Sequence, residues 1–216
     1  MKLFITGIGT DVGKTIASAI ITEALEADYW KPVQAGDLAH SDSHKVEKYI
    51  SNKKTKFHPN AYALNTPASP HLAAELEGIT IDIKNIKEPN PESYRNNSHL
   101  VIEGAGGVFV PLNDADCVID LIQPDHKVVV VSRHYLGSIN HTLLTVEALK
   151  SRKLDIVGIV FNGDDPDSYR DKASEDIILK KTGLKMIGRI ENEPYFDQNV
   201  IQYYADKFRE SLLELS

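Results

Sequence analysis

The chain has little cysteine and no long apolar run, and both shortages limit what it can be. Its 216 residues include one cysteine, Cys117, so no disulfide can form within the chain. A lone cysteine is typical of a reducing compartment, where it is most often a small buried hydrophobic residue. No apolar run approaches the roughly 20 residues that a membrane-spanning helix needs, and the apolar start "MKLFITG" is too short for a signal-peptide core. We therefore expect a cytoplasmic protein with no membrane partner.

Positive charge is scarce as well. The sequence has 24 Lys and Arg against 31 Asp and Glu, which gives a formal net charge of -7. General nucleic-acid binding needs a basic surplus that neutralises phosphates, so we expect no nucleic-acid partner. The 8 histidines do not cluster at metal-ligand spacing, and we expect them to be surface or capping residues. With 42% hydrophobic residues, the composition is typical of a globular protein with one sizeable core.

Short runs rich in β-branched residues alternate with longer helical patterns. The short runs, several of them apolar throughout as in strands buried on both faces, predict strands at Lys2–Thr6, Tyr29–Val33, Leu100–Glu103, Lys127–Ser132, Ile156–Phe161 and Met186–Ile190. The helical patterns cover Lys14–Ala27, Asp42–Ser51, Ser138–Arg152, Pro166–Thr182 and Tyr195–Leu215, and a short helix begins at Ser69-Pro70. Ile81–Asn97 is predicted to end as a polar surface loop. This alternation predicts a three-layer α/β fold, a mostly parallel central sheet flanked by helices, in a single domain over residues 1–216.

A glycine-rich turn joins the first predicted strand to the first predicted helix in "LFITGIGTDVGKTIAS". It ends in Gly13-Lys14-Thr15, the close of a phosphate-binding loop, but Ile8 stands where the usual G-x-x-x-x-G-K-[ST] pattern needs glycine. The strand–turn–helix context still favours a phosphate site over a chance Gly-Lys-Thr. Backbone N–H groups at the helix start attract phosphate, Lys14 can reach the β- and γ-phosphates, and the Thr15 hydroxyl can bind Mg²⁺.

Two charged residues lie at the ends of predicted strands, and a third lies at the start of a predicted helix. Glu103 ends the run "HLVIE" and precedes "GAGG", and the carboxyl ends of parallel strands open on a shared crevice. A carboxylate there can hold Mg²⁺, which we favour over a glutamate paired with a surface lysine. Asp42 is equally well explained as a helix N-cap. Lys31, at the end of the second predicted strand, is either a crevice cation or an ordinary solvated lysine.

Six segments resemble the dethiobiotin synthetase family. "TGIGTDVGKT", "KPVQAG", "SPHLAA", "EGAGG", "LGSINHTLLT" and "GIVFN" occur in that family's order and spacing, from Met1 to about Asn162. The phosphate loop alone is shared by many nucleotide hydrolases, whereas the joint occurrence of "KPV", "EGAGG" and "LGSINH" is far more specific. In the family the loop is one residue longer than usual and begins where Gly7 stands. The resemblance implies a P-loop NTPase-like fold, and it implies that Ile8 is a family trait.

The resemblance also implies an activity. The family uses ATP to close a ring in 7,8-diaminopelargonic acid with CO2 or bicarbonate, which gives dethiobiotin in biotin biosynthesis. One amine takes up CO2 as a carbamate, whose oxygen attacks the γ-phosphate of MgATP. The second amine then attacks the mixed anhydride and expels phosphate. Bringing an anionic carbamate to a phosphate costs Coulomb energy that cations must offset.

The matching motifs assign roles to individual residues. The implied catalytic residues are Lys31, Lys14 and Thr10, and the implied Mg²⁺ ligands are Thr15, Asp42 and Glu103. The implied nucleotide contacts are Asp11, Val12, Gly13, Lys14, Thr15, Ile16, Asp42, Glu103, Gly104, Ala105, Gly106, Asn162 and Gly163. Asn162 would read the adenine edge with its amide. The implied substrate contacts are Ala35, Ser69, Gly137, Ser138, Ile139 and Asn140.

In the family, the segment that matches Gly137–Asn140 binds the substrate carboxylate across a dimer interface, which implies a functional homodimer. From the residues alone, this segment is equally well explained as an ordinary helix cap.

Two departures from the family stand out. In "GRIENEPYF" Arg189 replaces an acidic residue and an expected proline is missing, which bears on base selectivity. Ala35 replaces a Ser or Thr, so a substrate hydrogen bond worth about 1 kcal/mol is lost. Two other classes remain: a P-loop switch or partitioning ATPase would need a further signature lysine early in the loop, where Ile8 and its neighbours stand. A nucleotide-binding module without catalysis is disfavoured, because the charged candidates are all present.

Overall fold

The computed structural model describes residues 1–90, 99–164 and 169–215. Within this part of the chain, seven parallel strands form one sheet in the order β4-β2-β6-β1-β7-β8-β9. These strands are β1 (Lys2–Gly7), β2 (Asp28–Trp30), β4 (Phe57–His58), β6 (Leu100–Gly107), β7 (His126–Arg133), β8 (Asp155–Asp164) and β9 (Met186–Glu191). A separate parallel pair consists of β3 (Val33–Ala35) and β5 (Tyr62–Leu64).

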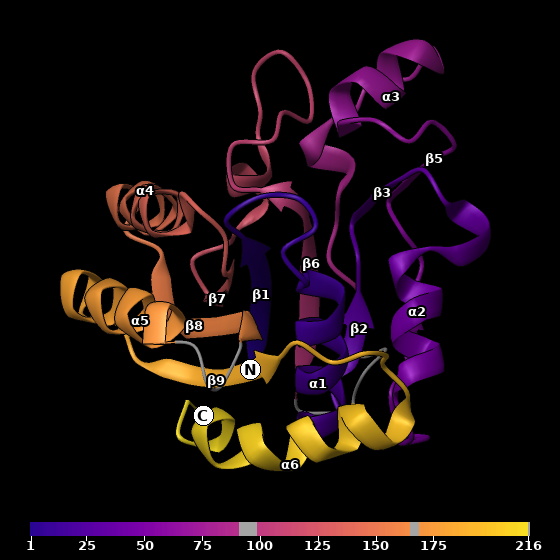
Figure 1. Cartoon of the computed structure of the whole chain (residues 1–216). Coiled ribbons are helices and arrows are strands. Elements are labelled where there is room, and N and C mark those ends of the chain that lie inside the picture. The colour runs from indigo at the N-terminus through magenta and orange to yellow at the C-terminus, as the bar shows by residue number, and fades with distance from the viewer. Residues whose placement is uncertain (91–98, 165–168, 216) are drawn as a thin grey trace.

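Helices cover both faces of the sheet (Figure 1). On one face α1 (Lys14–Leu25) packs against α2 (Asp42–Tyr49) and α6 (Gln198–Leu213), and on the other α4 (Ser138–Ser151) packs against α5 (Tyr169–Thr182). The short helix α3 (Pro70–Leu76) packs on β3 and β5. The 3₁₀ helices are η1 (Leu38–His40), η2 (Ile83–Asn85) and η4 (Val118–Leu121). The predicted three-layer, mostly parallel α/β fold is therefore confirmed.

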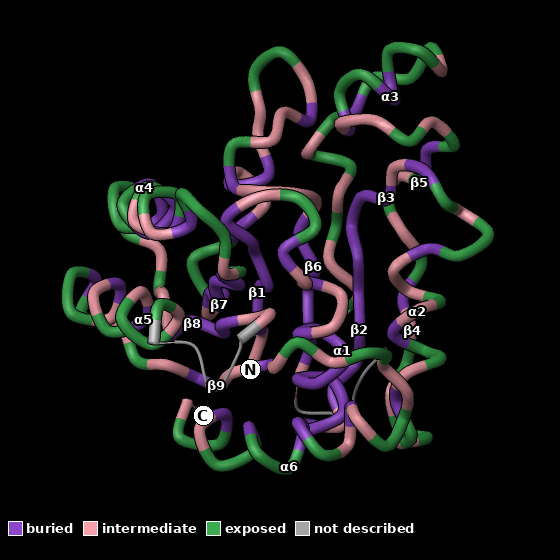
Figure 2. The backbone as a smooth tube through the Cα atoms, viewed as in Figure 1, coloured by how far each residue is buried: buried purple, intermediate pink, exposed green. Residues whose placement is uncertain are grey.

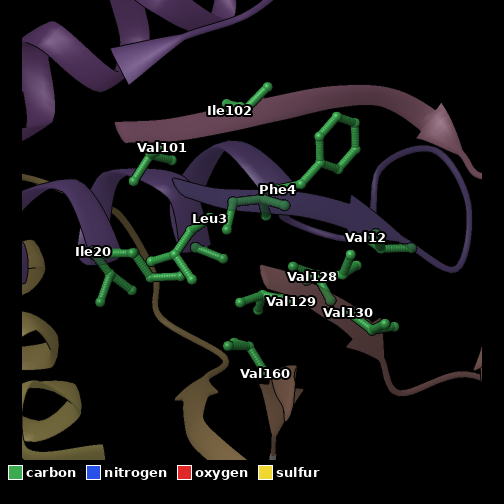
Figure 3. Close-up of a cluster of buried hydrophobic side chains, with 14 of the residues drawn as sticks. Leu3, Phe4, Val12, Ile20, Val101, Ile102, Val128, Val129, Val130 and Val160 are labelled. Carbon is green, nitrogen blue, oxygen red and sulfur yellow. The ribbon is translucent and has the colours of Figure 1, made fainter. Parts of the chain in front are cut away.

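The core lies on both faces of the central strands. Leu3 and Phe4 are neighbours in β1 that point to opposite faces, and both are fully buried. Figure 3 shows them packed among Ile20, Val101, Ile102, Val128, Val129, Val130 and Val160. Each such side chain contributes about 1.5–3 kcal/mol on burial. In Figure 2 the buried residues concentrate in these strands, which explains their continuously apolar sequences.

The second predicted strand is broken in two. β2 ends at Trp30 and the chain resumes as β3 at Val33, so the expected single strand Tyr29–Val33 is wrong. Pro32 has no N–H to donate to a neighbouring strand. The carbonyl oxygen of Lys31 instead accepts a hydrogen bond of 2.7 Å from the Asn60 side chain. The break places Lys31 beyond the carboxyl end of β2.

The strand that carries Glu103 is longer than predicted. β6 continues through the glycines to Gly107, which pairs with Gly7, so Glu103 lies inside the strand rather than at its end. A Cβ at Gly104 would lie 3.1 Å from the Phe4 ring, so a larger residue there would require the fully buried Phe4 to shift.

Capping and loops differ in detail. Ser41, not Asp42, is the N-cap of α2, and Asp42 is its first residue, so the capping explanation of Asp42 is wrong. Ser69 precedes α3 as expected, with Pro70 in the first turn. The predicted start of the helix at Pro166 lies outside the described residues, as does part of the predicted loop Ile81–Asn97.

Two histidines are buried, contrary to prediction. His58 lies 2.9 Å from Asp28, and His126 lies 2.5 Å from Glu88. Glu88, Asp125 and His126 bring potential metal-ligating atoms within 4.8 Å of one another. The Lys2 ammonium already forms ion pairs with the carboxylates of Glu88 and Asp125, so it supplies the positive charge that a metal ion would bring. Among the described helices, none is long and apolar enough to span a bilayer.

Candidate active site

A cavity of about 820 Å³ opens beside the phosphate loop, and we call it the crevice. Its wall includes many of the predicted site residues: Thr10, Asp11, Gly13, Lys14, Thr15, Ile16, Lys31, Ala35, Asp42, Ser69, Glu103, Ala105 and Gly106. The predicted residues Val12, Gly104, Asn162, Gly163 and Gly137–Asn140 do not line it. The crevice thus unites the phosphate loop with the three charged candidates, which lie far apart in the sequence.

The phosphate loop is tightly folded despite its extra residue. Gly13 is the N-cap of α1 with φ of 94°, a left-handed conformation that favours glycine. A Cβ at Gly7 would lie 2.5 Å from the Val12 side chain. Ile8 is buried with 9% of its surface exposed, so the residue that breaks the usual pattern is part of the core.

Lys14 begins α1 and is almost fully buried at the crevice. Its ammonium donates a hydrogen bond of 2.9 Å to the carbonyl oxygen of Gly9. Burial lowers the pKa of Lys14 to about 8, although the nearby Glu103 carboxylate opposes the shift. The Lys14 side chain thus folds back from the start of α1 onto the phosphate loop, where the motif requires its ammonium.

Four polar side chains from four parts of the chain meet in the crevice. The Lys31 ammonium lies 2.7 Å from Asp42 Oδ2 and 3.1 Å from Glu103 Oε1. The Thr15 hydroxyl donates a hydrogen bond of 3.0 Å to the same Glu103 oxygen. Burial alone would lower the pKa of Lys31, but the two carboxylates outweigh it and raise that pKa. Burial would likewise raise the pKa of Asp42, but Lys31 outweighs it and lowers that pKa.

These donors fit a magnesium ion. Thr15, Asp42 and Glu103 offer one hydroxyl and two carboxylates, and hard oxygen donors are those that Mg²⁺ prefers. The Lys31 ammonium between the two carboxylates marks a position where positive charge is stabilised. The family resemblance implied that these residues converge, and in the structure Thr15, Asp42 and Glu103 meet around the Lys31 ammonium.

The far end of the predicted nucleotide site adjoins the loop from another strand. Asn162, near the end of β8, donates a hydrogen bond of 2.9 Å from its amide to the Val12 carbonyl oxygen. A Cβ at Gly13 would lie 2.0 Å from that amide nitrogen. Arg133 Nη1 donates a hydrogen bond of 2.9 Å to the carbonyl oxygen of Asp11. The end of the sheet that carries Asn162 is therefore fixed against the phosphate loop.

Known proteins with similar sequences span nearly the whole chain. The ATP-dependent dethiobiotin synthetase BioD of Christiangramia forsetii is 58% identical over 213 residues, which are 98% of each chain. That of Cytophaga hutchinsonii is 49% identical over 99% of each chain. A family model described as an AAA domain also matches residues 1–200. The chain belongs to the dethiobiotin synthetase family.

Solved structures of similar fold are P-loop ATPases of low sequence identity. The MinC:MinD cell division complex of Aquifex aeolicus gives a TM-score of 0.59 at 15% identity, covering 99% of this chain and 95% of that one. The cell division ATPase MinD of Pyrococcus furiosus gives 0.57 at 13% identity, covering 100% and 99%. These likenesses show the fold, and the site of the dethiobiotin synthetase family must be argued from its residues.

The departure at Arg189 has a structural explanation. Its guanidinium lies 2.5 Å from the carboxylate of Glu175, which is fully buried on α5. His134 Nε2 lies 3.3 Å from the other oxygen of the same carboxylate. An acidic residue at position 189 would meet Glu175 as a like charge, whereas Arg189 supplies the positive partner of this buried carboxylate.

The segment Gly137–Asn140 opens α4 and lies outside the crevice of its own chain. Gly137 is the N-cap with φ of 106°, again a conformation that favours glycine. Leu136 just before it is fully exposed, at 104% relative accessibility.

Several residues of the crevice were not found from the sequence: Val33, Gln34, Lys45, Tyr49, Pro67, Ala68, Pro70 and Val110. Gln34 accepts a hydrogen bond of 3.3 Å from the backbone N–H of Asp42, and the Lys45 ammonium lies 3.7 Å from the Asp42 carboxylate. Lys45 and Tyr49 follow Asp42 by three and seven residues on α2, a helical spacing that puts them on the same face. That spacing was a usable signal for both.

Proposed function

We propose that this protein is an ATP-dependent dethiobiotin synthetase, acting as a single domain in the cytoplasm. It would carboxylate 7,8-diaminopelargonic acid with CO2 and close the ureido ring. The observation that carries the proposal is Lys31, a second buried cation that contacts the two candidate metal-ligating carboxylates beside the phosphate loop. A second anion brought to the γ-phosphate, as a carbamate is, requires such a cation. The full-length identity to named dethiobiotin synthetases supports it.

The proposed chemistry runs in two bond exchanges. The carbamate oxygen forms a bond to the γ-phosphorus while the bond to the leaving ADP oxygen breaks. The second amine then attacks the carbonyl carbon, loses a proton and expels phosphate. Lys31 would hold the carbamate and stabilise the phosphoryl group in transfer, Lys14 would bridge the phosphates, and Thr10 would orient the carbamate. These groups act by position and charge, as expected for phosphoryl transfer.

Magnesium would be held by Thr15, Asp42 and Glu103, and when bound it would neutralise phosphate charge. A structural neighbour, the MinD protein of Pyrococcus horikoshii with a TM-score of 0.58, was solved with Mg-ADP. At the other end of the nucleotide, the Asn162 amide would read the adenine edge. Its amide nitrogen has two hydrogens, so one can keep the bond to the Val12 carbonyl oxygen while the other donates to the base.

We further propose a homodimer in which Gly137–Asn140 of one subunit completes the substrate site of the other. This segment does not line the crevice of its own chain, although its backbone N–H groups at the start of α4 suit a carboxylate. Leu136 and Leu144, on either side of it, are exposed apolar residues with relative accessibilities of 104% and 59%. Burial in a dimer would remove this apolar surface from water.

The deciding experiment measures phosphate release and dethiobiotin formation by the purified chain with MgATP, bicarbonate and diaminopelargonate. We expect both products in equal amounts and negligible phosphate without the diamine. Phosphate release that ignores the diamine would instead favour a switch or partitioning ATPase. In the Lys31→Ala variant, turnover should be abolished while nucleotide still binds. Full activity of that variant would refute the role given to Lys31.

A further inference from the structure

A fully buried tyrosine lies next to the charged cluster of the crevice. Tyr29 is the central residue of β2, between Val101 of β6 and Phe57 of β4, and none of its surface is exposed. Its hydroxyl donates a hydrogen bond of 2.9 Å to Glu103 Oε2. Neither the family motifs nor the shape of the crevice points to this residue, because it does not line the cavity.

The two oxygens of Glu103 have different partners. Oε1 receives the hydrogen bonds of Thr15 and Lys31, which both line the crevice. Oε2 receives the hydrogen bond of Tyr29 from the interior. The last torsion of a glutamate is broad and roughly two-fold, so packing alone fixes the carboxylate plane poorly. A bond to one oxygen from each side fixes that plane and determines which oxygen faces the crevice.

The phenol is suited to this task. A phenol hydroxyl has one hydrogen to donate and brings no charge of its own, and here it donates that hydrogen to Oε2 of Glu103. Tyr29 stands two residues before Lys31, with Trp30 between them bonded elsewhere, to the carbonyl oxygen of Pro59. The stretch "DYWKP" therefore supplies both the interior and the crevice-side partner of one carboxylate.

We propose that Tyr29 is a positioning residue that holds Glu103 so that Oε1 is presented to the magnesium ion. The inference rests on the proposed function, since it takes Glu103 as a metal ligand. Groups that hydrogen-bond to a metal ligand orient it, and their loss typically weakens metal binding by about 10–100-fold.

The test compares Mn²⁺ binding, followed by electron paramagnetic resonance, in the full-length wild type and the Tyr29→Phe variant. Both are saturated with a non-hydrolysable ATP analogue. Tyr29→Phe keeps the ring and removes the hydrogen bond, and it should bind Mn²⁺ about 10-fold or more weakly. In turnover assays, the Mg²⁺ concentration for half-maximal rate should rise by a similar factor. The KM for diaminopelargonate should stay the same.

Tyr204→Phe is the matched control. Tyr204 is also fully buried and also donates to a carboxylate, that of Glu193, outside the crevice. The melting temperature of both variants should fall below that of the wild type, but Tyr204→Phe should bind Mn²⁺ as tightly as the wild type. Wild-type Mn²⁺ affinity in Tyr29→Phe, or an equal loss in both variants, would overturn the proposal. A wild type that binds Mn²⁺ but makes no dethiobiotin would refute the proposed function and leave this comparison valid.

Discussion

Replacing Lys31 by methionine removes a buried ammonium while keeping most of the side-chain volume. The ammonium lies 2.7 Å from Asp42 and 3.1 Å from Glu103. At an effective dielectric constant of about 20, these contacts correspond to attractions of about 6 and 5 kcal/mol before desolvation. Desolvation offsets much of this, but the variant leaves two carboxylates without their cation. Removing one partner of a buried pair typically costs about 3–5 kcal/mol of unfolding free energy.

Thermal unfolding without metal measures this cost. In a chain of this length, 1 kcal/mol shifts the melting temperature by about 2–4 °C, so Lys31→Met should melt roughly 6–20 °C below the wild type. Added Mg²⁺ should recover more stability in the variant than in the wild type, because the ion neutralises the same carboxylates. Turnover of diaminopelargonate should fall by about 10³-fold or more, as when a positioned charge is removed from a phosphoryl-transfer site.

Lys45→Met is the control for this prediction. Its ammonium lies 3.7 Å from the same Asp42, but 43% of the side chain is exposed. A pair of this kind contributes about 0–1 kcal/mol, so the control should melt close to the wild type. The reasoning is refuted if the two variants melt alike, or if Lys31→Met keeps more than about a tenth of wild-type turnover.

Three further predictions concern stability and assembly. Burial opposes the ionised form of Glu23, but hydrogen bonds from Ser51 and its neighbour outweigh it and lower the pKa. The ionised carboxylate therefore stabilises the fold above the unfolded pKa of about 4.3, and this is lost as the pH falls through the lower folded pKa. In urea titrations at pH 7, the unfolding free energy of Glu23→Gln should be about 1–3 kcal/mol below that of the wild type. Between pH 7 and 3.5, the unfolding free energy of this variant should fall less than that of the wild type. Gly188→Ala would place a Cβ 2.1 Å from the Phe208 ring, so its unfolding free energy should fall by about 1–3 kcal/mol in the same titrations. Leu136→Asp should convert the proposed dimer to monomers in sedimentation velocity, because it puts a charge in the interface; an unchanged dimer would place the interface elsewhere.

Much of the fold could be predicted because its signals are local. Continuous β-branched runs indicated the central strands, and the shared edge of parallel strands pointed to a crevice beside Glu103. That Asp42 and Lys31 would join it was implied by the family resemblance. The burial of His58 and His126 could not be predicted, because each depends on a carboxylate about 30 or more residues away in sequence. The extension of β6 beyond Glu103 could not be predicted either, because glycines usually mark a turn, whereas here Gly107 pairs with Gly7 of β1.

The break after β2 explains how this fold brings a second buried cation, Lys31, beside the phosphate loop. In a continuous strand, the residue at position 31 would remain in the sheet, with its side chain on one of the two covered faces. Pro32 interrupts the ladder, so the chain leaves the sheet and forms β3, whose residues Val33 and Ala35 line the crevice. The same segment leads into α2, which begins at Asp42 and faces Lys31 across 2.7 Å. One interruption of a buried strand thus places a cation, its carboxylate partner and part of the cavity wall beside the phosphate loop.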